Sequence, residues 1–236
     1  RPPRSTLFPY TTLFRSIQFL KSRLRNLMSQ INAHFIFNTL ENINCLAQIE
    51  NNQQIVTMSK SLGDMLRYSI EYERDEEKLK TEVMHIRQYI NIQEIRFGNQ
   101  IQVDLDISEE LLEAKVLKFM LQPVVENALI HGIAAMDGDG VINVKIYRQQ
   151  DTIILKVMDN GRGISEGKLE ELKQHMASKG KPGFRRIGIT NVFNRIQLIY
   201  GDGYGGTIDS CEGMFTCVEL HLPAGGEKDG LEDFTG

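Results

Sequence analysis

Apolar residues recur at helical spacing along the first part of the chain. From Leu20 to Ile31 they stand three or four residues apart, as in a helix that packs along one side. The spacing resumes after the polar stretch 51–54. It predicts two long helices, from Ile17 to about Glu50 and from Ile55 to Phe97, with a break in the second near residues 75–78. The apolar face of the second helix begins with Ile55, Met58, Leu62, Met65 and Leu66.

Two long helices joined by a short connector form an antiparallel hairpin. A single hairpin leaves its apolar stripe in water, whereas a second copy of the same hairpin would cover it. We therefore expect residues 17–97 to form half of a four-helix bundle and the protein to be a homodimer.

Beyond Gly98 the apolar positions alternate with a period of two, which is typical of strands. Helices are predicted at 116–133 and 190–201, and Pro123 inside the first of them predicts a kink. This succession predicts an α+β fold, an α/β sandwich with helices on one face of a mixed sheet. The predicted strands cover 101–107, 141–148, 152–159, 205–213 and 215–223.

The two ends of the chain differ in composition from the rest. Residues 1–16 hold three of the six prolines and resemble a translated sequencing adapter, so we expect a non-native leader there. Residues 225–236 are polar and predict a flexible tail. Between these ends we assign residues 17–97 to the helical hairpin and residues 98–224 to a second domain.

Composition excludes several classes of function. The formal net charge of −4 argues against a nucleic-acid partner. Three cysteines without a CxxC pair indicate a reducing compartment rather than a disulfide framework. The chain has no apolar run long enough to span a membrane. We expect a cytoplasmic location, with membrane attachment only through sequence upstream of this chain.

One histidine stands on the first helix with an asparagine at each following turn. His34, Asn38 and Asn42 share a helix face because they are spaced by four residues. A metal site is disfavoured, since no second ligand stands at a suitable spacing. The periodicity fits both a histidine packed inside the bundle and an exposed nucleophile.

Three motifs in the second domain carry residues suited to nucleotide chemistry. The first is "ENALIHG" at 126–132, where Asn127 offers a carbonyl oxygen to magnesium. The second is "DNGRGI" at 159–164, where Asp159 ends an apolar strand and needs a donor, for which the amine of adenine is a candidate. The third, "RRIGITNVFNRI" at 185–196, opens a helix whose free amides suit phosphates.

In this order and spacing, the motifs resemble the N, G1 and G2 boxes of the nucleotide-binding superfamily that contains gyrase, the 90-kDa heat-shock protein, histidine kinases and MutL. The upstream segment "QINAHFIFNTLENI" narrows the resemblance to the LytS/YesM-type sensor histidine kinases, and "LRYSI", "YINIQEIRFG" and "LQPVVENA" fit the same family. The resemblance covers roughly Leu24 to Pro223.

This resemblance implies a protein-histidine kinase that transfers a phosphoryl group from Mg-ATP to His34 and then to an aspartate of a response regulator. His34 is then the phosphoacceptor, Asn127 the magnesium ligand and Asp159 the adenine anchor. Asn38, one turn after His34, is placed to orient its ring. The residues implied to shape the nucleotide site and its lid are Gly161, Gly163 and Gly188.

Other site positions depart from the family pattern. Proline usually precedes the phosphoacceptor, where this chain has Ala33, and a lysine usually stands at Ile130. His131 is a candidate substitute for that lysine in contacting phosphate. Arg186 replaces the first glycine of the third motif. Glu126 is our candidate general base. The alternative is that Glu126 is an ordinary surface residue or pairs with arginines of the lid.

Two other hypotheses stay open at the level of sequence. One is an ATPase of the same superfamily that forms no phosphohistidine, which the "QINAHFIFN" segment argues against. The other is a degenerate module that binds nucleotide and signals by conformation alone, which the departures at Ala33, Ile130 and Arg186 favour.

Overall fold

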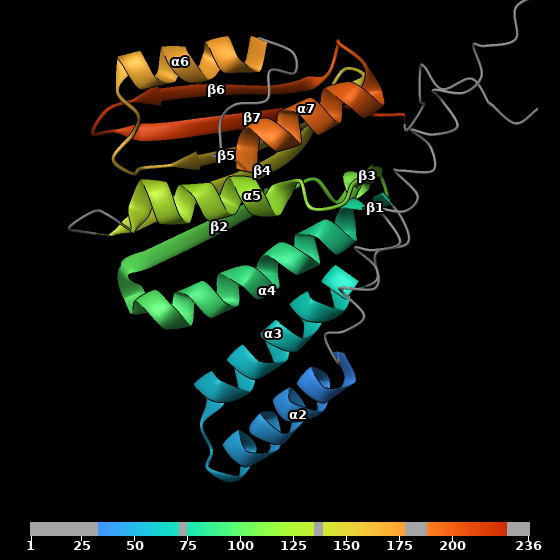
Figure 1. Ribbon diagram of the computed structural model, residues 1–236, viewed down its shortest axis with the longest axis vertical. Helices are drawn as coiled ribbons and strands as arrows, with labels where there is room; N and C mark the ends of the chain where they lie inside the picture. The colour runs from blue at the N-terminus through green and yellow to red at the C-terminus, as the bar shows by residue number, and fades with distance from the viewer. Residues whose placement is uncertain (1–32, 71–74, 135–138, 178–187, 226–236) are drawn as a thin grey trace, which may run out of the picture. The chain divides into compact units, whose positions relative to one another are not determined.

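The computed structural model describes residues 33–70, 75–134, 139–177 and 188–225 (Figure 1). These residues fall into two compact units, one ending at Lys60 and the other beginning at Ser61. The predicted leader, the first half of the first predicted helix, Arg186 and nearly all of the predicted tail lie outside the described residues.

The first unit contains α2 (Ala33–Ile49), the turn of the predicted hairpin and the start of its second helix. Helix α2 is followed by a tight turn and by α3 (Gln53–Ile70), which continues into the second unit. Asn52 caps α3, because its side-chain oxygen accepts the amide of Ile55 at 3.2 Å. The two helices are joined by Asn44, whose amide donates to the carbonyl oxygen of Val56 and the hydroxyl of Ser59, both at 3.2 Å.

The predicted break near residues 75–78 is confirmed. Strand β1 (Glu76–Lys78) pairs with β3 (Lys115–Leu117), and α4 (Leu79–Phe97) starts directly after β1. The core of the second unit includes five side chains of α4, which are Leu79, Val83, Ile86, Tyr89 and Ile90. By packing, α4 therefore lies with the sheet, whereas the sequence places it with the hairpin. The functional division at Gly98 stays a prediction.

The second unit is built on a five-stranded mixed sheet of order β2-β4-β5-β7-β6. Strands β2 and β4 are parallel, and the other neighbours are antiparallel. All five strands coincide with predicted ones: β2 (Ile101–Ile107), β4 (Gly140–Gln149), β5 (Thr152–Asp159), β6 (Gly205–Cys211) and β7 (Phe215–Pro223).

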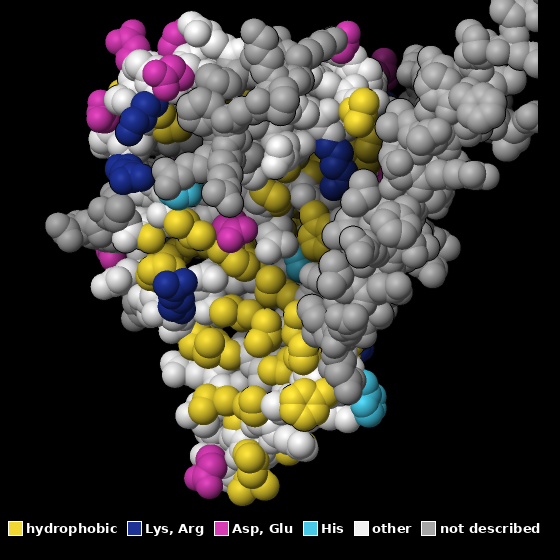
Figure 2. Space-filling model, in the orientation of Figure 1, with side chains coloured by type: hydrophobic (Ala, Val, Ile, Leu, Met, Phe, Trp, Pro, Cys, Tyr) yellow, Lys and Arg dark blue, Asp and Glu magenta, His cyan; other side chains and the backbone are white. Residues whose placement is uncertain are grey.

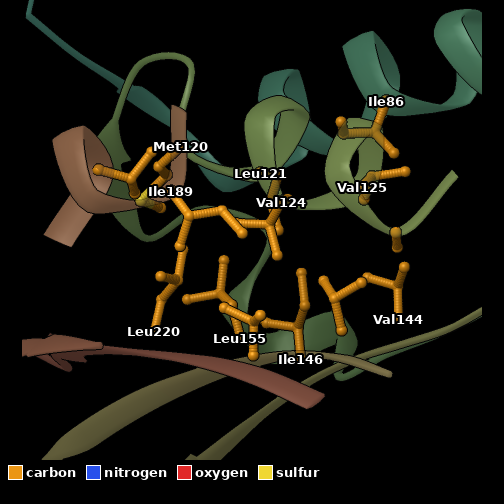
Figure 3. Packing of buried hydrophobic residues seen from close by; sticks show 14 of the residues in the cluster. Ile86, Met120, Leu121, Val124, Val125, Val144, Ile146, Leu155, Ile189 and Leu220 are labelled. Atoms are coloured by element: carbon orange, nitrogen blue, oxygen red, sulfur yellow. The ribbon is translucent and has the colours of Figure 1, made fainter. Parts of the chain in front are cut away.

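One face of this sheet carries the core, as the alternation of its strands predicts. In Figure 3, side chains of helix α5 (Leu121–Asn127), such as Leu121 and Val124, point toward Val144, Ile146 and Leu155 of the sheet. Helices α4, α6 (Glu166–Ala177) and α7 (Gly188–Tyr200) complete the core on the same face. The predicted sandwich, with helices on one face of a mixed sheet, is confirmed.

The helix predicted at 116–133 differs from the one observed. Helix α5 (Leu121–Asn127) begins later, because the preceding residues form β3, and it continues as a π-helical segment, η3 (Ala128–Ile133). Pro123 therefore lies in the first turn of α5, where its missing N–H has no intrahelical partner to lose. The predicted kink at Pro123 is wrong for this reason.

The stretch 160–188 contains a helix that its glycines and lysines concealed. Helix α6 (Glu166–Ala177) occupies its middle, and the predicted last helix is confirmed as α7 (Gly188–Tyr200). Two short 3₁₀ turns, η1 (Gly98–Gln100) and η2 (Glu109–Leu111), flank β2. All three cysteines are free thiols. Among the described helices, none has the length and apolar character needed to cross a bilayer.

Candidate functional site

Asp159 is the buried centre of the candidate site. It ends β5, only 3% of its surface is exposed, and its carboxylate accepts the amide of Gly161 at 2.9 Å. A Cβ atom added to Gly161 would stand 2.4 Å from the carboxylate, and one added to Gly132 would stand 2.5 Å from it. The first two motifs therefore meet here because both glycines lack a side chain.

Burial raises the pKa of the Asp159 carboxyl to about 6, although the amides of Gly161 and Thr216 act in the opposite direction. The group is thus mainly ionised at pH 7. A buried carboxylate with so few donors is a strong acceptor for an incoming N–H group.

The loop after Asp159 is held in place from both sides. On one side, the Arg162 amide donates to the Gly132 carbonyl at 3.1 Å. On the other, the amide of Gly213, at the β6–β7 turn, donates to the Arg162 carbonyl at 2.6 Å. Gly163 has φ +65°, and a Cβ there would stand 2.0 Å from the Cys211 carbonyl oxygen. Only glycine fits that position.

Helix α5 and the π-helical segment η3 carry the other residues of the first motif. Glu126 and Asn127 are half-buried, and His131 is exposed. Burial, with a further contribution from the Glu126 carboxylate, raises the pKa of Tyr89 on α4 to about 12. Glu126 therefore lies close to α4. A π-helical turn is rare and often marks a functional site.

The third motif meets the first at Pro123. Gly188 opens α7, and a Cβ there would stand 3.3 Å from the Cβ of Pro123. Pro123 and Asn127 are one turn apart on α5 and therefore share a face. The start of α7, with its free amides, thus adjoins the helix that carries Asn127.

In the first unit, His34 is exposed on α2. The Asn38 amide nitrogen lies 3.3 Å from Nδ1 and 3.4 Å from Nε2 of the imidazole, so Asn38 flanks the ring through weak contacts. Within a single chain the imidazole of His34 is therefore accessible. Whether it packs inside a bundle of two hairpins stays open.

The structure brings together Asp159, Gly161 and the unpredicted Gly132, and it places Gly188 beside α5. Gly163 instead lies against the β6–β7 turn. Sequence reasoning missed Gly132 as a site residue, although a glycine within a helical segment costs about 1 kcal/mol and calls for a reason. It also missed Asn160, whose side-chain oxygen accepts the amide of Val141 at 2.7 Å and fixes the start of β4.

Comparisons with known proteins agree with this geometry. Residues 22–101 match a family described as histidine kinase, and residues 113–226 match one described as histidine kinase-, DNA gyrase B- and HSP90-like ATPase. The sensor histidine kinase YesM of Bacillus subtilis (strain 168) is 33% identical over 207 residues, which cover 88% of this chain and 34% of that protein.

Two further similarities were found, one to a curated protein and one to a solved structure. The sensor histidine kinase YpdA of Escherichia coli (strain K12) is 35% identical over 184 residues, covering 78% of this chain and 31% of that protein. A solved histidine kinase domain, from the blue-light activated histidine kinase of Erythrobacter litoralis EL346, has a TM-score of 0.45 at 16% identity. It covers 82% of this chain and 94% of that domain. The chain spans about a third of the length of these two curated relatives.

The sheet, its covering helices and the matched family define an ATP-binding domain of the histidine kinase, gyrase and HSP90 class. The chain as a whole, with its histidine kinase segment ahead of that domain, belongs to the LytS/YesM-type sensor histidine kinases. The predicted resemblance is confirmed.

Proposed function

We propose that this chain is the kinase core of a two-component sensor. It phosphorylates His34 from Mg-ATP and passes the phosphoryl group to an aspartate of a response-regulator receiver domain. The observation that carries this proposal is the exposed imidazole of His34 in a chain whose second unit holds Asp159 buried against two glycines. The family matches support the same function.

Asp159 is the proposed adenine anchor. Its ionised carboxylate would accept a hydrogen bond from the exocyclic amine of adenine, which is a donor. Gly132 and Gly161 let the ring approach the carboxylate, because any side chain at either position would occupy the same space. Gly163 shapes the loop that follows.

Asn127 is the proposed magnesium ligand. Its side-chain oxygen is a hard donor, and Mg²⁺ commonly takes few protein ligands together with substrate phosphates. Among the described residues, no group of three His, Cys, Asp or Glu side chains is placed to hold a metal ion, so a site shared with phosphate fits best. When bound, the ion would neutralise charge on the transferred phosphoryl group. The amides at Gly188 and the exposed His131 are the further phosphate contacts we propose.

Phosphoryl transfer depends mainly on alignment and charge neutralisation. A bond forms between an imidazole nitrogen of His34 and the γ-phosphorus, and the bond from that phosphorus to the bridging oxygen breaks, so that ADP leaves. The phosphorylated ring then gives up the proton on its other nitrogen. Glu126 is the proposed acceptor of that proton, and Asn38 orients the ring before the transfer.

We also propose that the protein acts as a homodimer through the hairpin. Four large apolar side chains of α2 stay exposed, and Figure 2 shows hydrophobic side chains gathered on the hairpin. An exposed apolar stripe of this size on one helix face is typical of a surface that is buried against a partner. A second hairpin would provide it and complete a four-helix bundle. The four residues are Phe35, Ile43, Leu46 and Ile49.

The kinase core would work in the cytoplasm, where ATP and a response regulator are present. Membrane attachment, if the whole protein has it, would come from sequence outside this chain. The proposed order of domains is a dimerisation and phosphoacceptor hairpin at 17–97, followed by the ATP-binding domain at 98–224.

The test is incubation of the chain with γ-labelled ATP and magnesium, beside His34→Gln and Asn127→Ala. We expect acid-labile, alkali-stable label in the parent and none in either variant. His221→Gln, on the outer face of the sheet, serves as the matched control and should label like the parent.

A parent that binds ATP but never acquires label would overturn the proposed kinase function. It would favour a nucleotide-sensing module instead, in keeping with the 47% exposed Ile130 at the position where the family carries a lysine. Release of phosphate without protein label would indicate an ATPase.

A further inference from the structure

A fully buried carboxylate in the second unit lies outside the nucleotide site. Glu82 on α4 has no exposed surface, and it accepts the amides of Phe119, Met120 and Leu121 at 2.7, 3.2 and 3.4 Å. These are the residues at which α5 begins. Free amides and the positive end of the helix dipole favour a negative charge at this point. One helix therefore holds the start of another.

The same carboxylate is also held by α3. The Tyr68 hydroxyl donates a hydrogen bond to Glu82. The Tyr68 ring packs on His85, with centroids 4.4 Å apart, and edge-on against Phe119 at 5.0 Å. Burial, followed by the Glu82 carboxylate, raises the pKa of Tyr68, so its hydroxyl stays a protonated donor at physiological pH.

Two further hydrogen bonds connect the same three helices, α3, α4 and α5. Nε2 of His85 lies 2.7 Å from the side-chain oxygen of Gln122 in the first turn of α5. On the α3 side, the Ser61 hydroxyl donates to the side-chain oxygen of Gln88 on α4, also at 2.7 Å. Residues 61–70 of α3, helix α4 and the start of α5 are thus joined by directional bonds as well as by apolar packing.

The backbone at this junction is itself unusual. Phe119 has φ +59°, a left-handed conformation that is uncommon for a bulky residue and costs energy. Such a conformation persists only where the surroundings fix it. The Glu82 carboxylate does so directly, because it binds the Phe119 amide.

A buried ionic network is a weak source of stability, since apolar residues of the same shape often stabilise a core as well. What hydrogen bonds add is a defined geometry. We propose that Tyr68 and Glu82 are positioning residues for phosphoryl transfer, which fix the start of α5, and through it Asn127, to the C-terminal half of α3. This inference rests on the proposed kinase function.

The proposal separates nucleotide affinity from the rate of transfer. The adenine anchor Asp159 stands on β5 and is held by the sheet, so it does not depend on the start of α5. Asn127 stands on α5 itself. Loosening the start of α5 would therefore disturb alignment of the phosphates while leaving adenine binding in place.

The experiment compares Tyr68→Phe with the parent in the full chain. Phenylalanine keeps the ring packing and removes only the hydroxyl. We expect the rate of His34 phosphorylation at saturating Mg-ATP to fall by about tenfold, while the dissociation constant for ADP changes by less than about threefold. Glu82→Gln, which keeps the shape but removes the charge, should show the same split more strongly.

Tyr200→Phe is the matched control, because it removes a buried hydroxyl from α7. A variant of Tyr68 that phosphorylates like the parent would overturn the proposal. The proposal would also be overturned if Tyr68→Phe and Tyr200→Phe had equal thermal stability and lost the same amount of phosphorylation rate.

Hydrogen exchange keeps this test independent of the kinase reaction. We expect faster exchange of the Phe119, Met120 and Leu121 amides in Tyr68→Phe than in Tyr200→Phe. A parent without phosphohistidine would overturn the proposed function, and the exchange at these amides would then decide whether the network holds α5. Unchanged exchange would overturn the network as well.

Discussion

At the scale of single residues, Asp159 lowers the stability of the fold at neutral pH. Its raised pKa means that the folded protein binds more protons than the unfolded chain between about pH 4 and 6. The free energy of unfolding therefore falls as the pH rises through this range. This loss of stability accompanies a buried, ionised carboxylate that is available to accept a hydrogen bond from a ligand.

Asp159→Asn should accordingly stabilise the protein while abolishing nucleotide binding. We expect the free energy of unfolding at pH 7 to rise by ~1–3 kcal/mol, because the buried charge is removed. The difference from the parent should vanish below about pH 3, where the carboxyl is protonated in both the folded and the unfolded state. Urea unfolding at several pH values measures this. A variant less stable than the parent at pH 7 would contradict it.

Gly161→Ala tests the space around the carboxylate. The new Cβ would stand 2.4 Å from both the Asp159 carboxylate and the backbone of Gly132, so one of them has to move. We expect ADP binding to weaken by about tenfold or more, equivalent to ~1.4 kcal/mol. Isothermal titration measures the affinity. Gly203→Ala is the control, since nothing lies within 4 Å of its added Cβ, and equal losses in both variants would refute the argument.

Motif spacing, which is a property of the sequence, singled out Asp159, Gly161 and Asn127 as candidates, and their roles stay predictions. It could not identify Gly132 as a neighbour of Asp159, because that contact joins a helix to a distant strand. The buried position of Glu82 was concealed for a similar reason. A glutamate on an amphipathic helix is normally exposed, and its partners on α5 are far away in sequence.

At the scale of elements, strand alternation predicted the sheet well because one face is buried along every strand. Helix boundaries were predicted less well. The start of α5 is set by the pairing of β3 with β1 and by Glu82, neither of which the local sequence reveals. Helix α6 was hidden because its flanking glycines and lysines are typical of a loop.

The core beneath α5 sets the stability of the second unit. Leu155 is fully buried in the centre of β5, so Leu155→Ala should reduce the free energy of unfolding by ~2–5 kcal/mol through lost burial and a cavity. Leu198→Ala, at a position 85% exposed on α7, should change it by less than ~0.5 kcal/mol. Chemical denaturation measures both. Similar values for the two variants would contradict the assigned core.

At the scale of the whole molecule, the exposed face of α2 predicts association. Leu46 is 63% exposed, and Leu46→Glu would place a charge in the proposed dimer contact. We expect the dimer dissociation constant to rise by about 100-fold, or ~2.7 kcal/mol. Sedimentation velocity over a concentration series measures it. Leu198→Glu is the control and should leave association unchanged, whereas a parent that is monomeric throughout would exclude the dimer.

The parallel pairing of β2 with β4 has a consequence for how the chain folds. Strands β4 and β5, like β6 and β7, are joined by short turns and can pair early, whereas the register of β2 matches Ile101 to the distant Gly140. We therefore expect β2 to dock late. The segment between β2 and β4 carries Asn127 and Gly132, so this half of the proposed nucleotide site would be assembled only in the last stage of folding. A nascent or damaged chain that lacks β2 pairing would then be unable to consume ATP.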